Sequence, residues 1–314
     1  MDRKPVSVKS YANIAIVKYW GKADAERMIP STSSISLTLE NMYTETKLSF
    51  LPEDATGDVM YIDDELQGEK ETIKASKVLD LFRTNPNQHV KIETWNNMPT
   101  AAGLSSSSSG LSALVKAANE LFQVGKTQSE LAQIAKFASG SSSRSFFGPL
   151  AAWDKDSGEV YPVETDLKLA MIMLVLTDQK KPVSSRDGMK LCTETSTSFP
   201  EWIKQSEQDY KDMLVYLKAN DFQAVGELTE ANALRMHQTT STANPPFSYL
   251  TDASYQAMDK VKALRASGER CYFTMDAGPN VKVLCLEEDL DRLADHFRKD
   301  YQVIVSRTKE LPDA

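Results

Sequence analysis

Residues 99–110 read Pro-Thr-Ala-Ala-Gly-Leu-Ser-Ser-Ser-Ser-Ser-Gly, and they decide how the rest of the chain is interpreted. The apolar residues that follow, over 111–122, recur at helical spacing. A helix that begins here presents unpaired backbone N–H groups and the positive end of its dipole, and small residues let an anion approach closely. The stretch therefore predicts a phosphate-binding loop. It lacks the Gly-Lys-Ser/Thr ending of a Walker A loop, and a flexible serine linker is the alternative.

The composition is that of an ordinary globular protein. The chain has 314 residues, 41% hydrophobic and 25% charged, enough for two domains or one large one. No run approaches the roughly 18 apolar residues of a membrane helix. Three cysteines without CxxC spacing argue for a cytoplasmic protein without a disulfide framework or a zinc site. A net charge of −8 disfavours nucleic acid and anionic membranes as partners, although a local cluster of cations can still bind small anions.

The alternation of patterns predicts an α+β architecture in two lobes, with a boundary near residues 165–185. Strand-like runs are expected at 6–16, 35–39, 43–48, 59–62, 89–95, 168–177, 271–275, 281–285 and 301–305. Helical spacing is expected at 69–82, 111–122, 131–138, 200–267 and 290–298, with a break at Asn244-Pro245-Pro246. The nearly continuous apolar run at 168–177 has the length of a central buried strand.

Two polar clusters occur in the first part of the chain. Residues 13–22, Asn-Ile-Ala-Ile-Val-Lys-Tyr-Trp-Gly-Lys, place two lysines and two aromatic residues at the end of an apolar strand. This pattern predicts an anion clamp, and solvated lysines are the alternative. Residues 137–145 carry Arg144 among serines, which suits bidentate capture of a carboxylate or a phosphate. A helix C-cap followed by a turn is the alternative there.

Two further clusters occur in the second part. Residues 182–190, Pro-Val-Ser-Ser-Arg-Asp-Gly-Met-Lys, indicate an anion site at a helix start, or an ordinary N-cap. Asp276, between an apolar strand and a Gly-Pro turn, is placed for proton transfer, or it merely caps the turn. The three histidines, at 89, 237 and 296, form no metal or catalytic motif and are expected to be structural. Several cationic and hydroxyl sites around one principal acid fit phosphoryl transfer to a strongly anionic acceptor.

The same stretches carry a family resemblance. The serine loop resembles the phosphate loop of the galactokinase, homoserine kinase, mevalonate kinase and phosphomevalonate kinase superfamily. Within that superfamily, NIAIVKYWGK at 13–22, ASGSSSR at 138–144, SSRDGMK at 184–190 and MDAGPNVK at 275–282 resemble the mevalonate diphosphate decarboxylases in their short bacterial form. The resemblance covers essentially the whole chain.

This resemblance implies a fold and an activity. The fold would be a ribosomal-S5-like N-terminal lobe and a ferredoxin-like C-terminal lobe, with the active-site cleft between them. Residues 1–178 would form the ATP-binding, kinase-like domain and residues 179–314 the substrate and catalytic domain. The reaction would convert (R)-5-diphosphomevalonate and ATP, with Mg²⁺, to isopentenyl diphosphate, ADP, phosphate and CO2 in the mevalonate pathway of isoprenoid biosynthesis. A homodimer is also implied.

Roles for individual residues follow from the resemblance alone. Asp276 would take or orient the proton of the 3-hydroxyl group, and Arg144 would hold the substrate carboxylate, with Asn13 nearby. Lys190 would neutralise the transferring phosphoryl group, and Lys22 would act in both catalysis and substrate binding. The substrate pocket would be lined by Asn13, Tyr19, Lys22, Ser139, Ser141, Arg144, Ser185, Arg186 and Met189.

The resemblance also implies a nucleotide site. Lys74 would lie near the nucleotide and Asn96 near the adenine. The phosphates would meet Pro99, Gly103, Leu104, Ser105, Ser106, Ser107, Ser108 and Ser109. Ser107 is the expected Mg²⁺ ligand, although five consecutive serines, where many relatives have Ser-Ser-Ala, leave open which hydroxyl reaches the metal.

Two other functions remain open from the residues. A superfamily kinase would stop at the phosphate ester and release no CO2. A non-catalytic nucleotide-binding regulator would show no ATP turnover that depends on a second substrate. The presence of Lys22, Arg144 and Asp276 together weighs against the second alternative.

Overall fold

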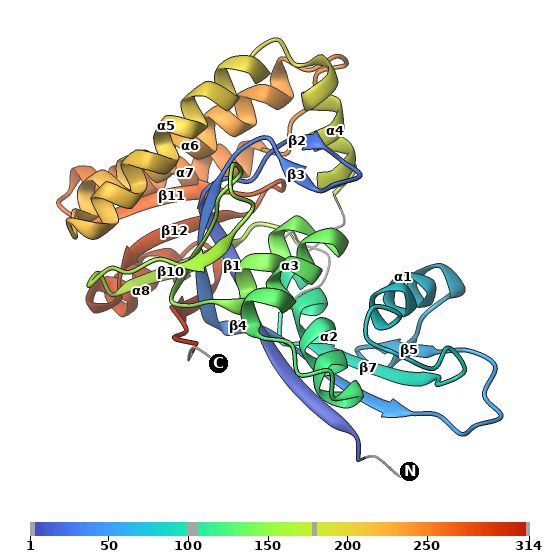
Figure 1. The fold of residues 1–314 in the computed structure, drawn as a ribbon. Coiled ribbons are helices and arrows are strands. Elements are labelled where there is room, and N and C mark those ends of the chain that lie inside the picture. Colours follow the sequence, from blue (N-terminus) through green and yellow to red (C-terminus); the bar gives the residue numbers. More distant parts are fainter. Residues whose placement is uncertain (1–3, 99–105, 178–180, 312–314) are drawn as a thin grey trace.

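The computed structural model describes residues 4–98, 106–177 and 181–311, which form two lobes, each built on its own β-sheet (Figure 1). The first sheet contains β1 (Val6–Val17), β4 (Ser34–Phe50), β5 (Val59–Ile62), β6 (Glu65–Leu66), β7 (Val90–Asn96), β8 (Leu150–Trp153) and β9 (Val160–Pro162). The second contains β10 (Leu169–Val175), β11 (Cys271–Met275), β12 (Val281–Leu286) and β13 (Gln302–Arg307). A hairpin of β2 (Lys22–Asp24) and β3 (Ile29–Pro30) lies apart from both sheets. The predicted α+β class and two-lobed architecture are confirmed.

A single long strand organises the first lobe. β4 spans 17 residues and pairs antiparallel with β1 along one edge. Its other edge is divided between β7, opposite residues 44–50, and β8, opposite residues 34–37. The sequence predicted two shorter strands here, because the polar residues Glu40 and Asn41 interrupt the apolar pattern. Both are exposed and continue the strand, and Asn41 is hydrogen-bonded to Val305 and Ser306 of the other lobe.

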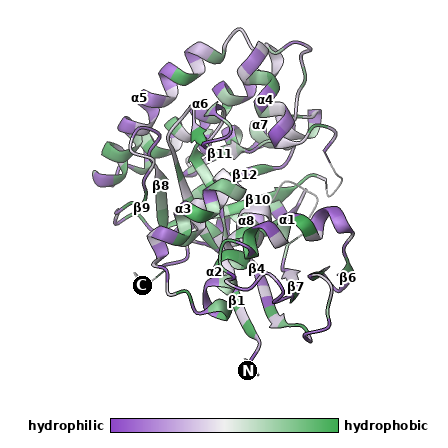
Figure 2. Cartoon of the chain, turned by 45° about the vertical axis from the view of Figure 1, so that its right-hand side comes forward, coloured by the Kyte–Doolittle hydropathy of each residue, from purple (hydrophilic) through white to green (hydrophobic). Residues whose placement is uncertain are grey.

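The helices are amphipathic covers for these sheets. They are α1 (Glu69–Leu79), α2 (Ser106–Phe122), α3 (Gln128–Ala138), the 3-10 helix η1 (Gly140–Phe146), α4 (Ser185–Thr195), α5 (Phe199–Lys218), α6 (Phe222–Ser241), α7 (Asp252–Ala266), the 3-10 turn η2 (Glu287–Asp289) and α8 (Leu290–Arg298). Figure 2 shows polar and apolar residues alternating along helices such as α5, as expected for one buried and one solvated face. α3 begins at the predicted capping box of Thr127 and Glu130.

The second sheet has the order β11-β12-β10-β13, with every pair antiparallel. β10 is therefore the predicted central strand, buried from Leu169 to Leu174. By its hydrogen bonds it belongs to the second lobe, whereas a division after residue 178 leaves it in the first. An apolar run predicts burial but does not say which sheet the strand will join. The division into residues 1–178 and 179–314 stays a prediction.

Hydrogen bonds join the two lobes at two places, one near each end of the sequence. The backbone N–H of Lys309, after β13, donates to the carbonyl of Thr38 on β4 at 2.8 Å. At the other end, the chain leaving β1 enters the second lobe, where Trp202 Nε1 of α5 donates to the carbonyl of Trp20 at 2.9 Å. Trp20 Nε1 in turn donates to Thr239 of α6 at 2.9 Å. These contacts fix the stretch after β1 that carries the predicted anion clamp.

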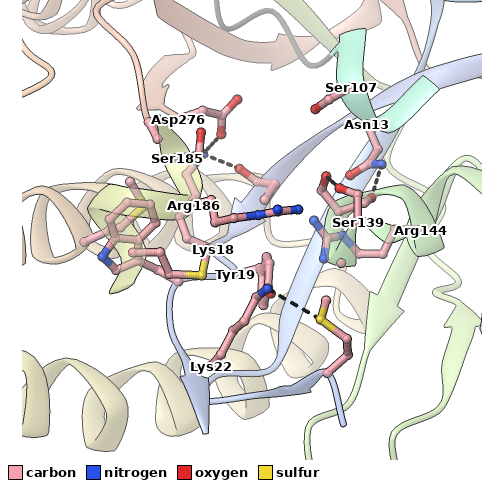
Figure 3. Close-up of a pocket in the computed structure, with 18 of the residues that line it drawn as sticks. Asn13, Lys18, Tyr19, Lys22, Ser107, Ser139, Arg144, Ser185, Arg186 and Asp276 are labelled. Carbon is pink, nitrogen blue, oxygen red and sulfur yellow. Dashed lines mark hydrogen bonds and ion pairs between the residues drawn. The ribbon is translucent and has the colours of Figure 1, made fainter. Parts of the chain in front are cut away.

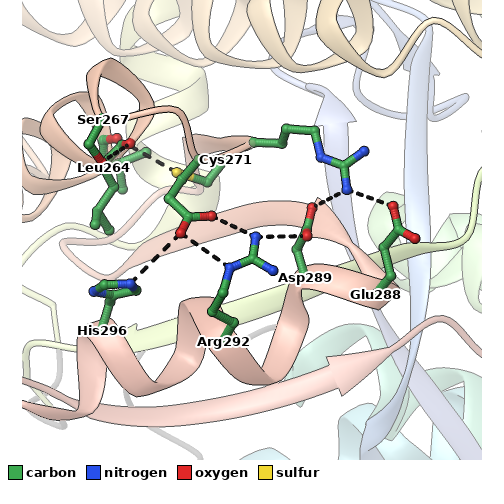
Figure 4. Close-up of polar contacts among 10 residues, drawn as sticks. Leu264, Ser267, Cys271, Glu288, Asp289, Arg292 and His296 are labelled. Atoms are coloured by element: carbon green, nitrogen blue, oxygen red, sulfur yellow. Dashed lines mark hydrogen bonds and ion pairs between the residues drawn. The ribbon is translucent and has the colours of Figure 1, made fainter.

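A cluster of ion pairs stabilises the second lobe away from the interface (Figure 4). Arg292 of α8 contacts Glu269 at 2.7 Å and the buried Asp289 at 2.8 Å, and Arg270 contacts Asp289 at 2.8 Å. Cys271 and Cys285 lie beside each other on β11 and β12, and both are buried free thiols. Within the described residues, no helix is long and apolar enough to cross a bilayer.

Candidate active site

A cavity of about 310 Å³ lies where β1, α2, η1, α4 and the β11–β12 turn meet (Figure 3). Its described lining is Asn13, Ala15, Lys18, Tyr19, Trp20, Lys22, Met28, Ser107, Phe137, Ala138, Ser139, Gly140, Ser141, Arg144, Lys181, Ser185, Arg186, Met189, Met236, Asp276 and Ala277. Five of these side chains are cationic and one is a carboxylate. Such a lining concentrates positive potential in a partly dehydrated space, which suits an anionic ligand.

Asp276, the one carboxylate of that lining, is held between two lysines. Lys18 Nζ lies 2.8 Å from its Oδ1, and Lys282 Nζ lies 3.0 Å from its Oδ2. Both lysines are almost completely buried, whereas the Asp276 side chain keeps 24% of its surface accessible. Burial by itself would raise the pKa of Asp276, but the two lysines outweigh burial and hold that pKa well below its usual value. Asp276 is therefore ionised, with an accessible edge toward the cavity.

For Lys18, burial has a larger effect on the pKa than the ion pair with Asp276 does. Burial lowers the pKa of Lys18 to about 8, and the charge and hydrogen bond of Asp276 only partly offset this effect. The Lys18 ammonium also donates to the carbonyl of Ala15 at 2.7 Å. Lys18 thus stays within its own lobe while it neutralises a carboxylate of the other lobe.

Arg144 is fixed by hydroxyl groups of the first sheet. Its Nη1 donates to Ser34 at 2.6 Å and its Nε donates to Ser36 at 3.0 Å, both on β4. Burial lowers the pKa of Arg144 to about 10, so the guanidinium remains charged at neutral pH. Figure 3 shows Arg144 and Arg186 facing the same space from opposite lobes. Together they form a site for a carboxylate or a phosphate.

Asn13 lines the cavity and keeps one buried acceptor. Its Nδ2 donates to the carbonyl of Ser141 and to the hydroxyl of Ser145, both at 2.8 Å. A carbonyl can only accept, so the amide orientation is fixed. The buried Oδ1 is left without a partner among the described residues. That oxygen suits a hydroxyl donor on a ligand and not an anion, although the sequence placed Asn13 with the substrate carboxylate.

The local fold of η1 depends on Gly140. A Cβ at this position would come within 2.9 Å of the rings of Tyr19 and Trp153. The backbone of η1 can therefore lie directly on these two rings, which brings Ser139 and Ser141 to the cavity.

Burial raises the pKa of Tyr19 to about 12, so its hydroxyl stays a neutral donor. Burial and the charge of Arg186 lower the pKa of Lys22, which also lines the cavity.

The first turns of α4 also line the cavity. Its N-cap is Ser184, whose hydroxyl accepts from the backbone N–H of Asp187. Ser185, Arg186 and Met189, which follow on the helix, line the cavity as predicted. Gly188 lies against the hydroxyl of Tyr249, which a Cβ at this position would approach to 2.1 Å. The alternative reading as an N-cap is thus also correct, because the cap is what aims the helix start at the cavity.

Two family models match the chain, one over each lobe. Residues 10–161 match the diphosphomevalonate decarboxylase-like N-terminal domain, and residues 171–312 match the mevalonate 5-diphosphate decarboxylase C-terminal domain. The chain belongs to the diphosphomevalonate decarboxylase family.

Individual relatives agree with this assignment. The diphosphomevalonate decarboxylase of Candida albicans is 31% identical, over 94% of this chain and 88% of its own length. A solved structure of mevalonate pyrophosphate decarboxylase from Streptococcus pyogenes is 66% identical, with a TM-score of 0.97, over 100% of this chain and 99% of that chain. Another, of MDDEF in complex with MVAPP, AMPPCP and magnesium, is 40% identical with a TM-score of 0.90, over 98% of both chains.

The structure brings most of the family-derived site residues together. Asp276, Ser107 and all nine predicted substrate-pocket residues line the same cavity. Ser108 and Ser109 are buried and are not part of its described lining. The Ser109 hydroxyl is hydrogen-bonded to Thr44, whose hydroxyl donates to Asn96. Ser106 begins α2. Pro99, Gly103, Leu104 and Ser105 lie outside the described residues.

Lys190 is the clear exception among the catalytic predictions. Its side chain is 74% exposed, is absent from the described lining and contacts Glu194 at 3.9 Å. Successive helix residues are rotated by about 100°, so Lys190 cannot share the inward face of Met189. Lys74 is also outside the cavity, 59% exposed and paired with Glu71 on α1. Asn96 lies at the end of β7, beyond the cavity, with its amide toward Asp63.

Three lysines around Asp276 were not predicted as site residues. Lys18 belongs to the predicted anion clamp and Lys282 to the motif at 275–282, whereas Lys181 lies just before the cluster at 182–190. Lys181 Nζ donates to Ser185 at 2.6 Å and to the carbonyl of Ala277 at 2.7 Å. Lys282 had a usable signal, because a lysine inside the apolar run of β12 must find a buried partner.

Proposed function

We propose that this protein catalyses the ATP-dependent decarboxylation of (R)-5-diphosphomevalonate to isopentenyl diphosphate, ADP, phosphate and CO2. The observation that carries the proposal is the placement of Asp276, clamped by Lys18 and Lys282, in the same cationic cavity as Arg144. The named activity of the family and the MVAPP and AMPPCP bound to its structural neighbour support the choice of substrates.

The chemistry requires that a tertiary hydroxyl become a leaving group. The 3-hydroxyl oxygen bonds to the γ-phosphorus of ATP, the bond from that phosphorus to ADP breaks, and the hydroxyl loses its proton. The C–O bond to the new phosphate then breaks. The electron pair of the C–C bond to the carboxylate forms the alkene, and CO2 departs. The cavity must therefore hold a diphosphate, a carboxylate and a transferring phosphoryl group together, and its five cationic side chains suit that task.

Asp276 acts on the 3-hydroxyl group in this proposal. Two lysines lower its basicity, so the carboxylate first accepts a hydrogen bond from the hydroxyl and orients its oxygen. It takes the proton as the bond to phosphorus forms, because that bond makes the proton strongly acidic. The Oδ1 of Asn13 is a second acceptor for the same or another substrate hydroxyl. Arg144 holds the substrate carboxylate, and Tyr19, Lys22 and Arg186 hold the diphosphate.

The nucleotide enters with Mg²⁺ in this proposal. The only carboxylate of the described lining, Asp276, is committed to two lysines, whereas the Ser107 hydroxyl faces the cavity from the first turn of α2. This donor set fits an ion that is held mainly by phosphate oxygens and water, with Ser107 as its protein ligand. When bound, Mg²⁺ neutralises charge on the phosphates. Lys74 and Asn96 remain proposed contacts on the nucleoside side, between α1 and β7.

We also propose that the enzyme works in the cytoplasm as a homodimer, with the functional division at residue 178. Three buried free cysteines support a reducing compartment. Val215 of α5 and Leu234 of α6 are exposed apolar side chains that a partner subunit would cover. Light scattering of the purified protein tests the dimer.

The proposed reaction is tested by measuring ADP and CO2 from the purified protein with ATP, Mg²⁺ and (R)-5-diphosphomevalonate. Equal amounts of the two products are expected. ADP formed with the substrate but without CO2 would identify a kinase that stops at the phosphate ester. No turnover with that substrate would overturn the proposal altogether.

A further inference from the structure

A buried chain of hydrogen bonds reaches from the helices of the second lobe to the backbone of Lys18. Asp209 of α5 accepts from Asn232 Nδ2 of α6 at 2.8 Å, and Asn232 Oδ1 accepts from the backbone N–H of Lys18 at 2.8 Å. Asn232 is completely buried and Asp209 is 1% exposed. Neither residue belongs to the described lining of the cavity.

The direction of this chain is fixed by chemistry. The Asp209 carboxylate can only accept, and it also accepts from Arg235 and from Gln205 Nε2. Asn232 must therefore turn its NH2 group toward Asp209 and its carbonyl oxygen toward Lys18. Asp209 thus sets the amide orientation that Lys18 requires.

Lys18 needs this support because it lies just beyond β1. The strand ends at Val17, where its pairing with β4 stops, so the N–H of Lys18 has no partner in the sheet. Asn232 supplies the acceptor from the other lobe. The side chain of Lys18 then runs to the Ala15 carbonyl and to Asp276, which also belongs to the second lobe. Backbone and side chain of Lys18 are consequently held by separate elements of that lobe.

The fold alone gives little reason for so polar an arrangement. A buried carboxylate and amide lose their hydration, and well-packed apolar side chains of similar volume often give equal or greater stability. Apolar residues on α5 and α6 would pack these helices equally well, but they would leave the backbone of Lys18 without an acceptor.

We propose that Asn232, oriented by Asp209, is a positioning residue that aligns Lys18 with Asp276 across the two lobes. The inference rests on the proposed function, since it concerns the carboxylate that acts on the 3-hydroxyl and the lysine paired with that carboxylate. A shift of about 1 Å in such groups can cost on the order of 100-fold in rate, even when the altered residue touches no substrate.

The test compares Asn232→Leu with Thr229→Val. Thr229 is also completely buried on α6, and its hydroxyl donates only to the Val225 carbonyl of its own helix. Asn232→Leu should lower kcat by about 100-fold while KM for ATP changes by less than about threefold. Thr229→Val should leave kcat of the folded protein near that of the wild type. Circular dichroism and the melting temperature report the folded fraction.

A double-mutant cycle with Lys18→Met separates positioning from general damage. If Asn232 acts through Lys18, Asn232→Leu should add less than about twofold to the kcat loss already present in Lys18→Met. A purely structural role predicts that the two losses multiply. Multiplying losses, or wild-type kcat in folded Asn232→Leu, would overturn the inference.

Asp209→Asn provides a second route if Asn232→Leu fails to fold. It keeps the size of the side chain but removes the charge that orients Asn232, and an intermediate loss of kcat with unchanged KM is expected. Wild-type kcat in Asp209→Asn would then contradict the inference. A wild-type protein that releases no CO2 would instead contradict the proposed function, so the two failures are distinguishable.

Discussion

Lys18 Nζ and Asp276 Oδ1 lie 2.8 Å apart, and the two residues come from different lobes. Lys18 follows β1 of the first sheet, whereas Asp276 follows β11 of the second. Lys282 holds the other carboxylate oxygen, so Asp276 has a fixed orientation and little basicity. The pair can form only when the lobes are correctly docked, and the integrity of the site therefore reports on the docking of the lobes.

Asp276→Asn should abolish most of the activity while binding persists. The amide keeps the shape of the carboxylate but cannot offer a charged acceptor to the 3-hydroxyl. We expect kcat to fall by about 100- to 10,000-fold, with a smaller change in KM for either substrate. Steady-state kinetics with the ADP and CO2 assay measures both constants. Near-native turnover would remove Asp276 from the reaction.

The activity should fall on the alkaline side near pH 8. Lys18 has a pKa lowered to about 8, so its ion pair with Asp276 is present below that pH and is lost as the pH rises through it. This alkaline fall should appear in the pH profile of kcat/KM. In the profile of kcat it should lie at higher pH, because bound polyphosphates favour the charged lysine. Lys18→Arg should remove the fall near pH 8, since a guanidinium does not titrate there. An unchanged fall in an active Lys18→Arg variant would assign it to another group.

Much of this site was predictable because its residues lie in short contiguous motifs. Asn13, Arg144, Arg186 and Asp276 each mark one motif, and the structure brings all four to one cavity. The sheet pairing that brings them together was not predictable from spacing. β10 shows why, since its apolar run predicts a buried strand equally well in either sheet.

The differences between the predicted site residues and the lining of the cavity have an equally physical origin. Lys190 was included because it closes a motif, but one further residue along α4 turns its side chain to solvent. Lys282 closes the motif at 275–282 but was not among the predicted site residues, although its burial within a strand required an anionic partner. A sequence identifies which residues can carry charge, and only the packing decides which of these charges are desolvated together.

Lys190 and Lys181 provide a direct comparison between an exposed and a cavity lysine. Lys190→Ala should change kcat/KM by less than about twofold, because an exposed ion pair contributes little. Lys181→Met removes a cation from the cavity and should lower kcat/KM by about tenfold or more. The same assay measures both variants. The reverse ranking would restore Lys190 as the residue that meets the phosphoryl group.

The lowered pKa of Lys116, on α2, leads us to expect an unusual pH dependence of the free energy of unfolding. Its Nζ donates to Ser10 at 3.0 Å and to the Ser145 carbonyl at 3.1 Å, and none of the described carboxylates pairs with it. Burial lowers its pKa from 10.5 to about 8. Between these values the unfolded chain binds a proton that the folded protein has released, so the free energy of unfolding should rise with pH across that window. Below pH 8 both states are protonated, and the cost of burying the charge is constant.

Lys116→Met should remove this dependence. Relative to the variant, the wild type should gain up to about 3 kcal/mol in the free energy of unfolding between pH 7 and pH 10, an upper value because the side chain is only partly buried. Urea unfolding of both proteins at pH 7, 9 and 10 measures the difference and cancels the contribution of Lys18, which has the same sign. Lys70→Met, at an exposed position of α1, is the matched control and should run parallel to the wild type. If Lys116→Met also runs parallel to the wild type, the Lys116 ammonium is solvated, and α2 carries no buried charge beneath its serine-rich first turn.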